Sequence, residues 1–225
     1  MTDRLPTTAG FPLSGLLTTT RLLIPHLVRA VPWWPFGAAV LLAVLAQMSV
    51  LVENPLDWAV LSGLWLAAGA LGAGAGFALP DAMGSTVITP VSRWVRQWLR
   101  AALVLLPAVA VWALLYIGVR QAVASHITWP AGLVILQAAV CGLLPVAAAA
   151  VGARYRETTT GALVGPAAQG VLLVGSLFFT QQASPWLMPG PTGWTAAQQV
   201  WPIALVLLLI MLLLANREST SPAGA

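Results

Sequence analysis

The stretch AALVLLPAVAVWALLYIGV, Ala101 to Val119, carries no charged side chain and lies between Arg100 and Arg120. Crossing the hydrocarbon core of a bilayer as an α-helix takes about 20 mainly apolar residues. Arginine is rare inside that core and common at its surfaces. An apolar run of this length between two arginines therefore predicts a helix that spans a membrane.

Five other stretches have the same uncharged, apolar character. They are Phe36 to Val52, Trp58 to Leu79, Ala131 to Ala153, Gly161 to Thr180 and Val200 to Ala215. A transmembrane β-barrel would instead show segments of about ten residues in which apolar and polar side chains alternate. We therefore expect an all-α integral membrane protein, a bundle of six transmembrane helices.

The composition leads to the same class of protein. Of the 225 residues 59% are hydrophobic and only 7% charged, whereas a soluble domain has about 25% charged residues. Such a chain cannot cover a globular surface in water, which excludes a soluble enzyme. Every basic residue is arginine, and together with abundant Ala, Gly and Pro this indicates a GC-rich bacterial coding sequence. The lone Cys141 excludes an intramolecular disulfide and a cysteine metal cluster.

The positions of the arginines set the expected orientation. With the N-terminus in the cytoplasm, only Arg120 falls outside, and the other arginines fall inside. These are Arg4, Arg21, Arg29, Arg93, Arg96, Arg100, Arg154, Arg156 and Arg217. Positively charged residues favour cytoplasmic loops. We therefore expect a multi-pass protein of the bacterial plasma membrane with both termini in the cytoplasm and the turn containing Glu53 and Asp57 outside.

The six spans divide the chain into three parts. Residues 1–35 are expected to form a cytoplasmic N-terminus with an amphipathic interfacial segment, Leu13 to Arg29. Residues 36–215 form the transmembrane domain, and residues 216–225 a disordered cytoplasmic tail. A cleaved signal peptide is not expected, because the first apolar run follows Trp33 and Trp34 and is as long as a span.

None of the expected spans contains Asp, Glu, Lys, Arg or His. The polar residues that remain at membrane depth are Gln47, Ser62, Gln137, Cys141, Gln169 and Ser176. Such side chains hydrogen-bond between helices, but they do not carry protons near neutral pH, whereas ion-coupled transporters place titratable groups there. Catalytic pairs, metal-binding motifs and a phosphate-binding loop are also missing from the sequence. We expect a non-catalytic chain with no cofactor or metal of its own, and any uphill transport would draw its energy from another protein.

The cytoplasmic connection PDAMGSTVITPVSRWVRQWLR, Pro80 to Arg100, is the most informative segment. Thr89 as N-cap and Pro90 at the first helical position predict a helix start. The helix would place Val91, Trp94, Val95, Trp98 and Leu99 on one face and Arg93, Arg96, Gln97 and Arg100 on the other. We expect it to lie along the inner headgroup layer before it turns into the third span. The short segment before it, Asp81 to Ile88, is a candidate docking site for a partner.

This segment resembles part of the permease subunits of ATP-binding-cassette (ABC) transporters of the type 2 class. The resemblance lies in Asp81 after the second span and in the run Thr89, Pro90, Val91, Ser92 and Arg93. The six spans, the cytoplasmic termini, the amphipathic N-terminal segment and a Trp- and Pro-rich connection before the last span agree with it. The connection before the last span is shorter than in larger relatives, which carry re-entrant helices there.

The resemblance implies partners and contact residues. Two permease chains, identical or different, would combine with a cytoplasmic ATPase dimer that binds ATP and magnesium. The coupling contacts would be Asp81, Met83, Thr86, Ile88, Pro90, Val91 and Arg93, with a second inner contact at Arg154, Arg156 and Glu157. Trp94, Arg96, Trp98 and Arg100 would anchor the helix at the interface. The arginines of both groups are also the residues expected of a simple interfacial anchor.

The substrate is expected to be hydrophobic or amphiphilic, and not a nucleic acid, because the spans offer no charge to pair. Trp65, Gln137, Gln169 and Phe178 are candidates for the pathway, although aromatic side chains in membranes more often face lipid or core. The row Ala68, Gly72 and Gly76 permits close helix approach, within one chain rather than between two. The main alternative function is a non-transporting membrane scaffold or assembly protein that recruits cytoplasmic partners.

Overall fold

The computed structural model describes residues 24–25, 27–52, 55–80, 93–123, 129–156, 159–176, 178, 186 and 198–217. The chain divides into two compact units, residues 1–31 and residues 32–225. In the first unit the described residues 24–25 and 27–30 are helical. Most of the predicted amphipathic segment Leu13 to Arg29 lies outside the described residues, and so does the C-terminal tail beyond Arg217.

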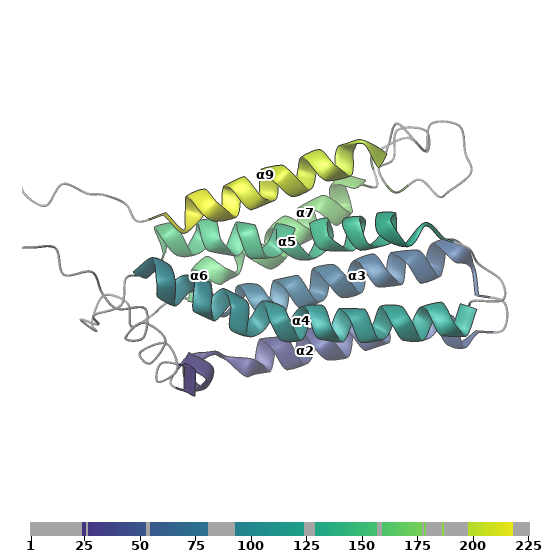
Figure 1. Cartoon of the computed structure of the whole chain (residues 1–225), viewed down its shortest axis with the longest axis horizontal. Coiled ribbons are helices and arrows are strands. Elements are labelled where there is room, and N and C mark those ends of the chain that lie inside the picture. The colour runs from purple at the N-terminus through teal and green to yellow at the C-terminus, as the bar shows by residue number, and fades with distance from the viewer. Residues whose placement is uncertain are drawn as a thin grey trace, which may run out of the picture. The chain divides into compact units, whose positions relative to one another are not determined.

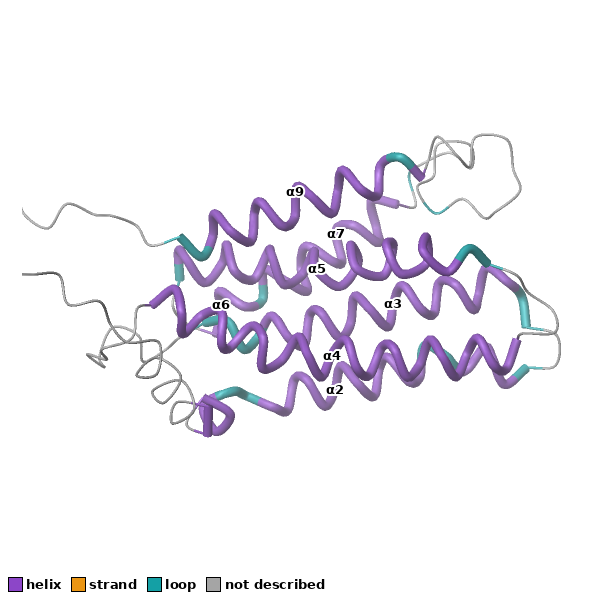
Figure 2. The backbone as a smooth tube through the Cα atoms, in the orientation of Figure 1, coloured by secondary structure: helices purple, strands orange, loops and turns teal. Residues whose placement is uncertain are grey.

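The second unit consists of helices and loops in its described part, as Figure 2 shows. Its elements are α2 (Trp33–Leu45), the 3₁₀ helix η1 (Met48–Leu51), α3 (Asp57–Gly76), α4 (Arg93–Val123), α5 (Ala131–Tyr155), α6 (Thr159–Ala162), α7 (Val164–Ser176) and α9 (Val200–Ala215). The long helices run side by side along the bundle (Figure 1). The all-helical class predicted from the sequence is confirmed for these residues.

Four helical segments are long and apolar enough to cross a membrane. They are Trp33–Leu51, Asp57–Gly76, Gln97–Val123 and Ala131–Tyr155. Two further apolar helices, Thr160–Ser176 and Val200–Ala215, are shorter. At 1.5 Å per residue they rise only about 24–26 Å, against a hydrocarbon core of about 30 Å. Four of the six predicted spans therefore have the required length, and the fifth and sixth remain predictions.

The fifth predicted span, Gly161 to Thr180, differs most from the structure. The helix is interrupted at Leu163 between α6 and α7, and α7 ends at Ser176. Pro166 accounts for the interruption, because it has no backbone N–H and its ring collides with the carbonyl group four residues earlier. In the first turn of α7 the same residue is tolerated, since the N–H groups there have no helical partner.

Helix α3 lies at the centre of the bundle, packing against α2, α4, α5 and α7. Its glycines allow this. A Cβ at Gly72 would overlap the backbone of Gly142 on α5, and one at Gly74 would lie 2.6 Å from the Cβ of Ala39 on α2. The close approach predicted for the Gly72 row is therefore made within this chain, because both partner helices belong to it.

Helix α4 is the least buried of the four long helices. Its buried residues follow one stripe that includes Gln97, Ala101, Val104 and Ala108 and continues with Val119 and Val123. The i, i+3 and i+4 spacing of this stripe is that of a helix packed on one neighbour. That neighbour is chiefly α3, so both flanks of α4 are open.

The ends of the helices alternate along the bundle. In Figure 1 the beginnings of α2 and α4 and the ends of α3, α5 and α9 lie at the same end. Because α4 begins at Arg93, α5 ends at Tyr155 and α9 ends at Ala215, the arginines next to these termini gather there. Arg120 lies in the last turn of α4, at the opposite end. The separation of arginines assumed from the sequence is thus present in the second unit.

Candidate functional site

The predicted coupling segment is only partly described. Asp81, Met83, Thr86, Ile88, Pro90 and Val91 lie outside the described residues. Arg93, Trp94 and Arg96 belong to the first turns of α4. We expected this segment to lie along the membrane and then turn into the span, but the helix runs without interruption from Arg93 to Val123. No proline or glycine before Pro107 breaks it, so the basic segment and the apolar segment form one rod.

Arg100 connects the beginning of α4 to the end of α3. Its side chain is buried, and its Nη1 donates a hydrogen bond to the carbonyl oxygen of Pro80 at 3.1 Å. Pro80 lies four residues beyond Gly76, the last residue of α3, in the connection that follows the helix. Arg100, predicted as an interfacial anchor, thus holds α3 and α4 together, while Trp98 beside it is half-buried.

Arg154 has a similar position on α5. Its Nη1 donates a hydrogen bond to the carbonyl oxygen of Leu214, in the last turn of α9. Arg154 and Arg156 are exposed, and Glu157 lies outside the described residues. The arginine end of the bundle therefore exposes Arg154 and Arg156, and Arg154 also bonds a carbonyl in the last turn of α9.

Towards the other end, three buried side chains form a hydrogen-bonded chain across the bundle. Trp65 on α3 donates its Nε1–H to Oε1 of Gln137 on α5 at 3.1 Å. The Nε2 of Gln137 in turn donates to Oε1 of Gln198, just before α9, at 3.1 Å. Of the predicted pathway residues, the structure brings Trp65 and Gln137 into direct contact.

Aromatic rings cover this chain of hydrogen bonds. The ring centroid of Trp186 lies 4.9 Å from that of Trp65 and 5.1 Å from that of Trp201 on α9. Such distances and tilted geometries are favourable for aromatic pairs. The cluster of Trp65, Gln137, Trp186, Gln198 and Trp201, which we name the Trp–Gln cluster, joins α3, α5 and α9.

The other two predicted pathway residues lie apart from it. Gln169 on α7 is buried against α3, where its Nε2 would lie 2.5 Å from a Cβ at Gly69. Phe178 follows α7 and is 84% exposed. Gln169 is thus part of the α3–α7 contact, and Phe178 projects away from the described core.

Two apolar hollows lie beside these residues. One, of about 300 Å³, lies between α3, α4 and α5 and includes Leu105, Trp112 and Ile135 in its lining. The other, of about 280 Å³, lies between α3 and α7, where Trp65 and Trp186 meet Ser62 and Ser176. Pockets that bind small ligands have volumes of about 300–1,000 Å³ and mainly apolar walls. Both hollows therefore have volumes at or just below the lower limit of this range.

Trp112 fixes α4 at the edge of the larger hollow. Its Nε1 donates a hydrogen bond to the carbonyl oxygen of Leu64 on α3 at 3.1 Å. Its ring stacks on that of Tyr116 at 5.2 Å, and Arg120 donates to the hydroxyl of Tyr116 at 3.2 Å. The half of α4 nearer Arg120 is thus bonded to α3 through Trp112, and the other half is bonded through Arg100 to Pro80, which follows α3.

The sequence did not identify Gln198, Trp186 or Trp201 as members of one site. The only signal was the Trp- and Pro-rich composition of the connection before the last span. Within the described ranges, no group of three or more His, Cys, Asp or Glu side chains could hold a metal ion.

The arrangement therefore offers apolar surface, aromatic rings and neutral hydrogen-bonding groups to a ligand. No protein-family model matches the chain, and neither a curated protein nor a solved structure shows significant similarity to it.

Proposed function

We propose that this chain is the transmembrane permease subunit of an ATP-driven exporter of the ABC type 2 class. In this proposal six helices cross the bacterial plasma membrane, with both termini in the cytoplasm. A second permease chain completes the substrate pathway, and a cytoplasmic ATPase dimer supplies the energy. The proposal rests on the segment from Asp81 to Arg93, whose pattern resembles that of the family, and on the form of α4.

The continuity of α4 is the structural observation that supports the proposal best. The helix has 31 residues and so rises about 46 Å, more than the thickness of the hydrocarbon core. Its basic end therefore extends beyond that core, and its other end reaches the opposite surface. A force applied near Arg93 would be transmitted along α4, because the helix continues on both sides of Pro107, where one backbone hydrogen bond is missing.

The surroundings of α4 support a role in transport. The helix packs chiefly on α3, and the larger apolar hollow lies along one of its flanks. A tilt of α4 about its contacts at Arg100 and Trp112 would change the width of that hollow. In the proposed cycle ATP binding closes the ATPase dimer, moves the docking segment, and shifts the bundle between inward- and outward-open states. The neutral walls suit a hydrophobic or amphiphilic substrate.

Co-purification followed by a turnover assay tests the proposal. The chain is expressed with any ATPase that proves to be encoded beside it, reconstituted into vesicles, and assayed for ATP hydrolysis and for export of fluorescent amphiphiles. The variant Pro90→Ala/Arg93→Glu is expected to lower both activities at least about tenfold, because a reversed charge at a protein contact costs several kcal/mol. Arg120→Glu at the opposite end is the matched control and should assemble and turn over normally.

The outcomes separate the two candidate functions. Failure of any ATPase to associate, or unchanged export by the double variant, contradicts the coupling proposal. Association of cytoplasmic proteins other than an ATPase, without transport, would favour the membrane scaffold.

A further inference from the structure

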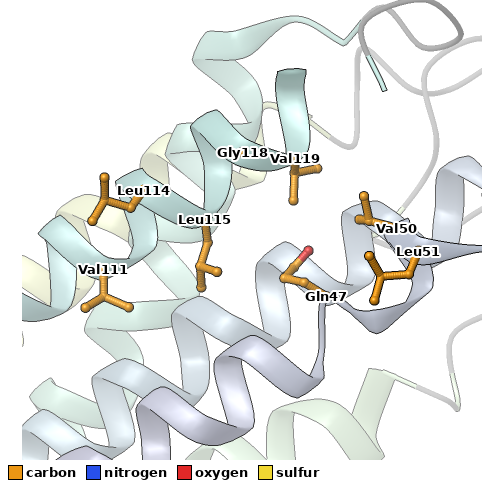
Figure 3. A pocket seen from close by; sticks show the side chains of 8 residues that line it. All are labelled: Gln47, Val50, Leu51, Val111, Leu114, Leu115, Gly118 and Val119. Atoms are coloured by element: carbon orange, nitrogen blue, oxygen red, sulfur yellow. The ribbon is translucent and has the colours of Figure 1, made fainter. Parts of the chain in front are cut away.

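A third pocket lies on the other flank of α4 from the 300 Å³ hollow between α3, α4 and α5. It is an open groove with a volume of about 380 Å³, lined by Gln47, by Val50 and Leu51 of η1 and by the segment of α4 from Val111 to Val119. Figure 3 shows its walls: Val50 and Leu51 on one side, and Leu115 and Val119 on the other. All its lining residues except Gln47 are apolar.

Gln47 enters this pocket at the point where α2 ends and η1 begins. Its backbone N–H is bonded to the carbonyl oxygen of Val44 at 3.0 Å. The side chain is more than nine-tenths buried, yet neither Oε1 nor Nε2 has a hydrogen-bond partner in the described structure. In Figure 3 the amide oxygen points into the space between Leu115, Val119 and Val50.

Helix α3 leaves room for the amide beside Gly63. A Cβ at Gly63 would lie 3.2 Å from Nε2 and 3.3 Å from Oε1 of Gln47, so the glycine makes the room in which the amide lies. Gln137 provides the contrast, because both polar atoms of its buried amide are bonded. A buried amide with two unpaired polar atoms is costly, and buried polar groups are normally bonded to protein, water or a ligand.

The pocket also defines the ligand that would pair with this amide. The ligand must donate to Oε1, the amide atom that is directed into the pocket, as a hydroxyl group does. Each amide atom exposes less than 1 Å², so the amide turns about its soft terminal torsion to meet the ligand. It must be uncharged, because no charged side chain lines the pocket. It must carry a hydrocarbon chain, because Leu51 and Leu114 in the lining are 78% and 71% exposed and open the pocket to an apolar surrounding.

The depth of Gln47 agrees with a lipid. The apolar segment that begins at Trp33 ends at Leu51, so Gln47 lies about 6 Å from its end. The hydroxyl and ester groups of lipids lie at this boundary between hydrocarbon and headgroups.

We propose that this pocket binds one uncharged, hydroxyl-bearing lipid from the bilayer. The lipid hydroxyl pairs with the Gln47 amide, and the acyl chain lies against Leu114, Leu115 and Gly118. This inference concerns binding alone and does not depend on transport.

Photo-crosslinking tests the site. The purified chain in phosphatidylcholine nanodiscs is irradiated with a monoacylglycerol that carries a diazirine in its acyl chain, and the adducts are mapped by mass spectrometry. A second probe has both hydroxyls converted to methyl ethers. The free-hydroxyl probe is expected to label residues 111–119 at least about fivefold more than the methylated probe, because the methyl ethers cannot donate a hydrogen bond.

Two variants and two controls complete the design. Gln47→Leu removes the amide, and Gly118→Leu fills the pocket; a Cβ at Gly118 meets nothing within 4 Å, so this variant should fold. Both should reduce labelling at least about fivefold. Gln169→Leu and Gly170→Leu, which replace the same residue types on α7, should label like the wild type. Thermal unfolding confirms that each variant is folded.

Three results would overturn the inference. One is equal labelling by the two probes, and another is unchanged labelling of Gln47→Leu. The third is a dimer in which a second copy shields residues 111–119 from both probes, because the pocket would then be a protein contact.

Discussion

At Gly72 the packing leaves no space for a side chain, because a Cβ there would overlap the backbone of Gly142. Gly72→Ala is therefore expected to force α3 away from α5 and to lower the free energy of unfolding by about 1–3 kcal/mol. Gly118→Ala is the matched control, since its Cβ meets open space and alanine favours helix by up to about 1 kcal/mol. Thermal unfolding in one detergent compares them, and equal stability of the two variants would contradict the close packing.

Gln137 is the residue that connects the Trp–Gln cluster. Gln137→Leu leaves Nε1 of Trp65 and Oε1 of Gln198 without their partner, and should destabilise the fold by about 1–2 kcal/mol. A double-mutant cycle with Trp65→Phe should give a coupling energy of about 0.6–1.7 kcal/mol, the range of hydrogen bonds between membrane helices.

Gln169→Leu is the control for this cycle, because Oε1 of Gln169 already lacks a partner in the described structure. It should be at least as stable as the wild type. A coupling energy of zero between Trp65 and Gln137 would show that their hydrogen bond contributes nothing to stability.

At the scale of the elements, the hydrogen bond from Arg100 to Pro80 joins the beginning of α4 to the segment that follows α3. Arg100→Gln should lower the free energy of unfolding by about 1–3 kcal/mol, because the carbonyl of Pro80 loses a charged donor. Arg100→Lys, which keeps a charge at this position, should restore part of the loss. Arg120→Gln serves as the comparison, since its bond to Tyr116 is exposed and should be worth less than about 0.5 kcal/mol. Chemical denaturation measures all three, and equal losses at Arg100 and Arg120 would contradict the prediction.

The boundaries of the helices show where hydropathy is sufficient to predict the ends of a helix and where it is not. The last apolar stretch, Val200 to Ala215, matches α9 residue for residue. The sequence predicted both the apolar part of α4, Ala101 to Val119, and a helix leading up to Arg100. The turn expected between them is absent, because polar residues continue a helix as easily as apolar ones. In the fifth apolar stretch, hydropathy did not predict the interruption at Leu163, because it does not register that Pro166 lacks a backbone N–H.

The same difference applies to the sites. The sequence selected Trp65 and Gln137 as residues at membrane depth, yet nothing in it said that they meet each other and Gln198. Which faces of two helices meet is decided by tertiary packing, here by the glycines of α3. The sequence also grouped Gln47 with the residues that bond between helices, whereas its amide is unpaired in the structure.

At the scale of the whole molecule, the predicted orientation can be tested with cysteine labels. Cys141 is fully buried, so the native chain should not react with a membrane-impermeant maleimide. Leu56 and Tyr155 are 61% and 82% exposed and are separated by α3, α4 and α5. Three crossings by these helices would place the two residues on opposite sides of a membrane.

Leu56→Cys should react in intact cells, and Tyr155→Cys only after permeabilisation, because the arginine-rich end is expected inside. The reverse result would invert the topology. Reaction of both variants in intact cells would contradict the three crossings between them.

The unequal lengths of the helices give the molecule an uneven hydrophobic thickness. Helix α5 rises about 37 Å, whereas α9, which packs against it, rises about 24 Å. If α9 crosses the bilayer as the sequence predicts, the bilayer beside it would have to thin, whereas the bilayer beside α4 would not. The stability of the bundle should therefore depend on membrane thickness. Lipids with shorter acyl chains should match the length of α9 and so fit best on the side of the bundle that α9 covers.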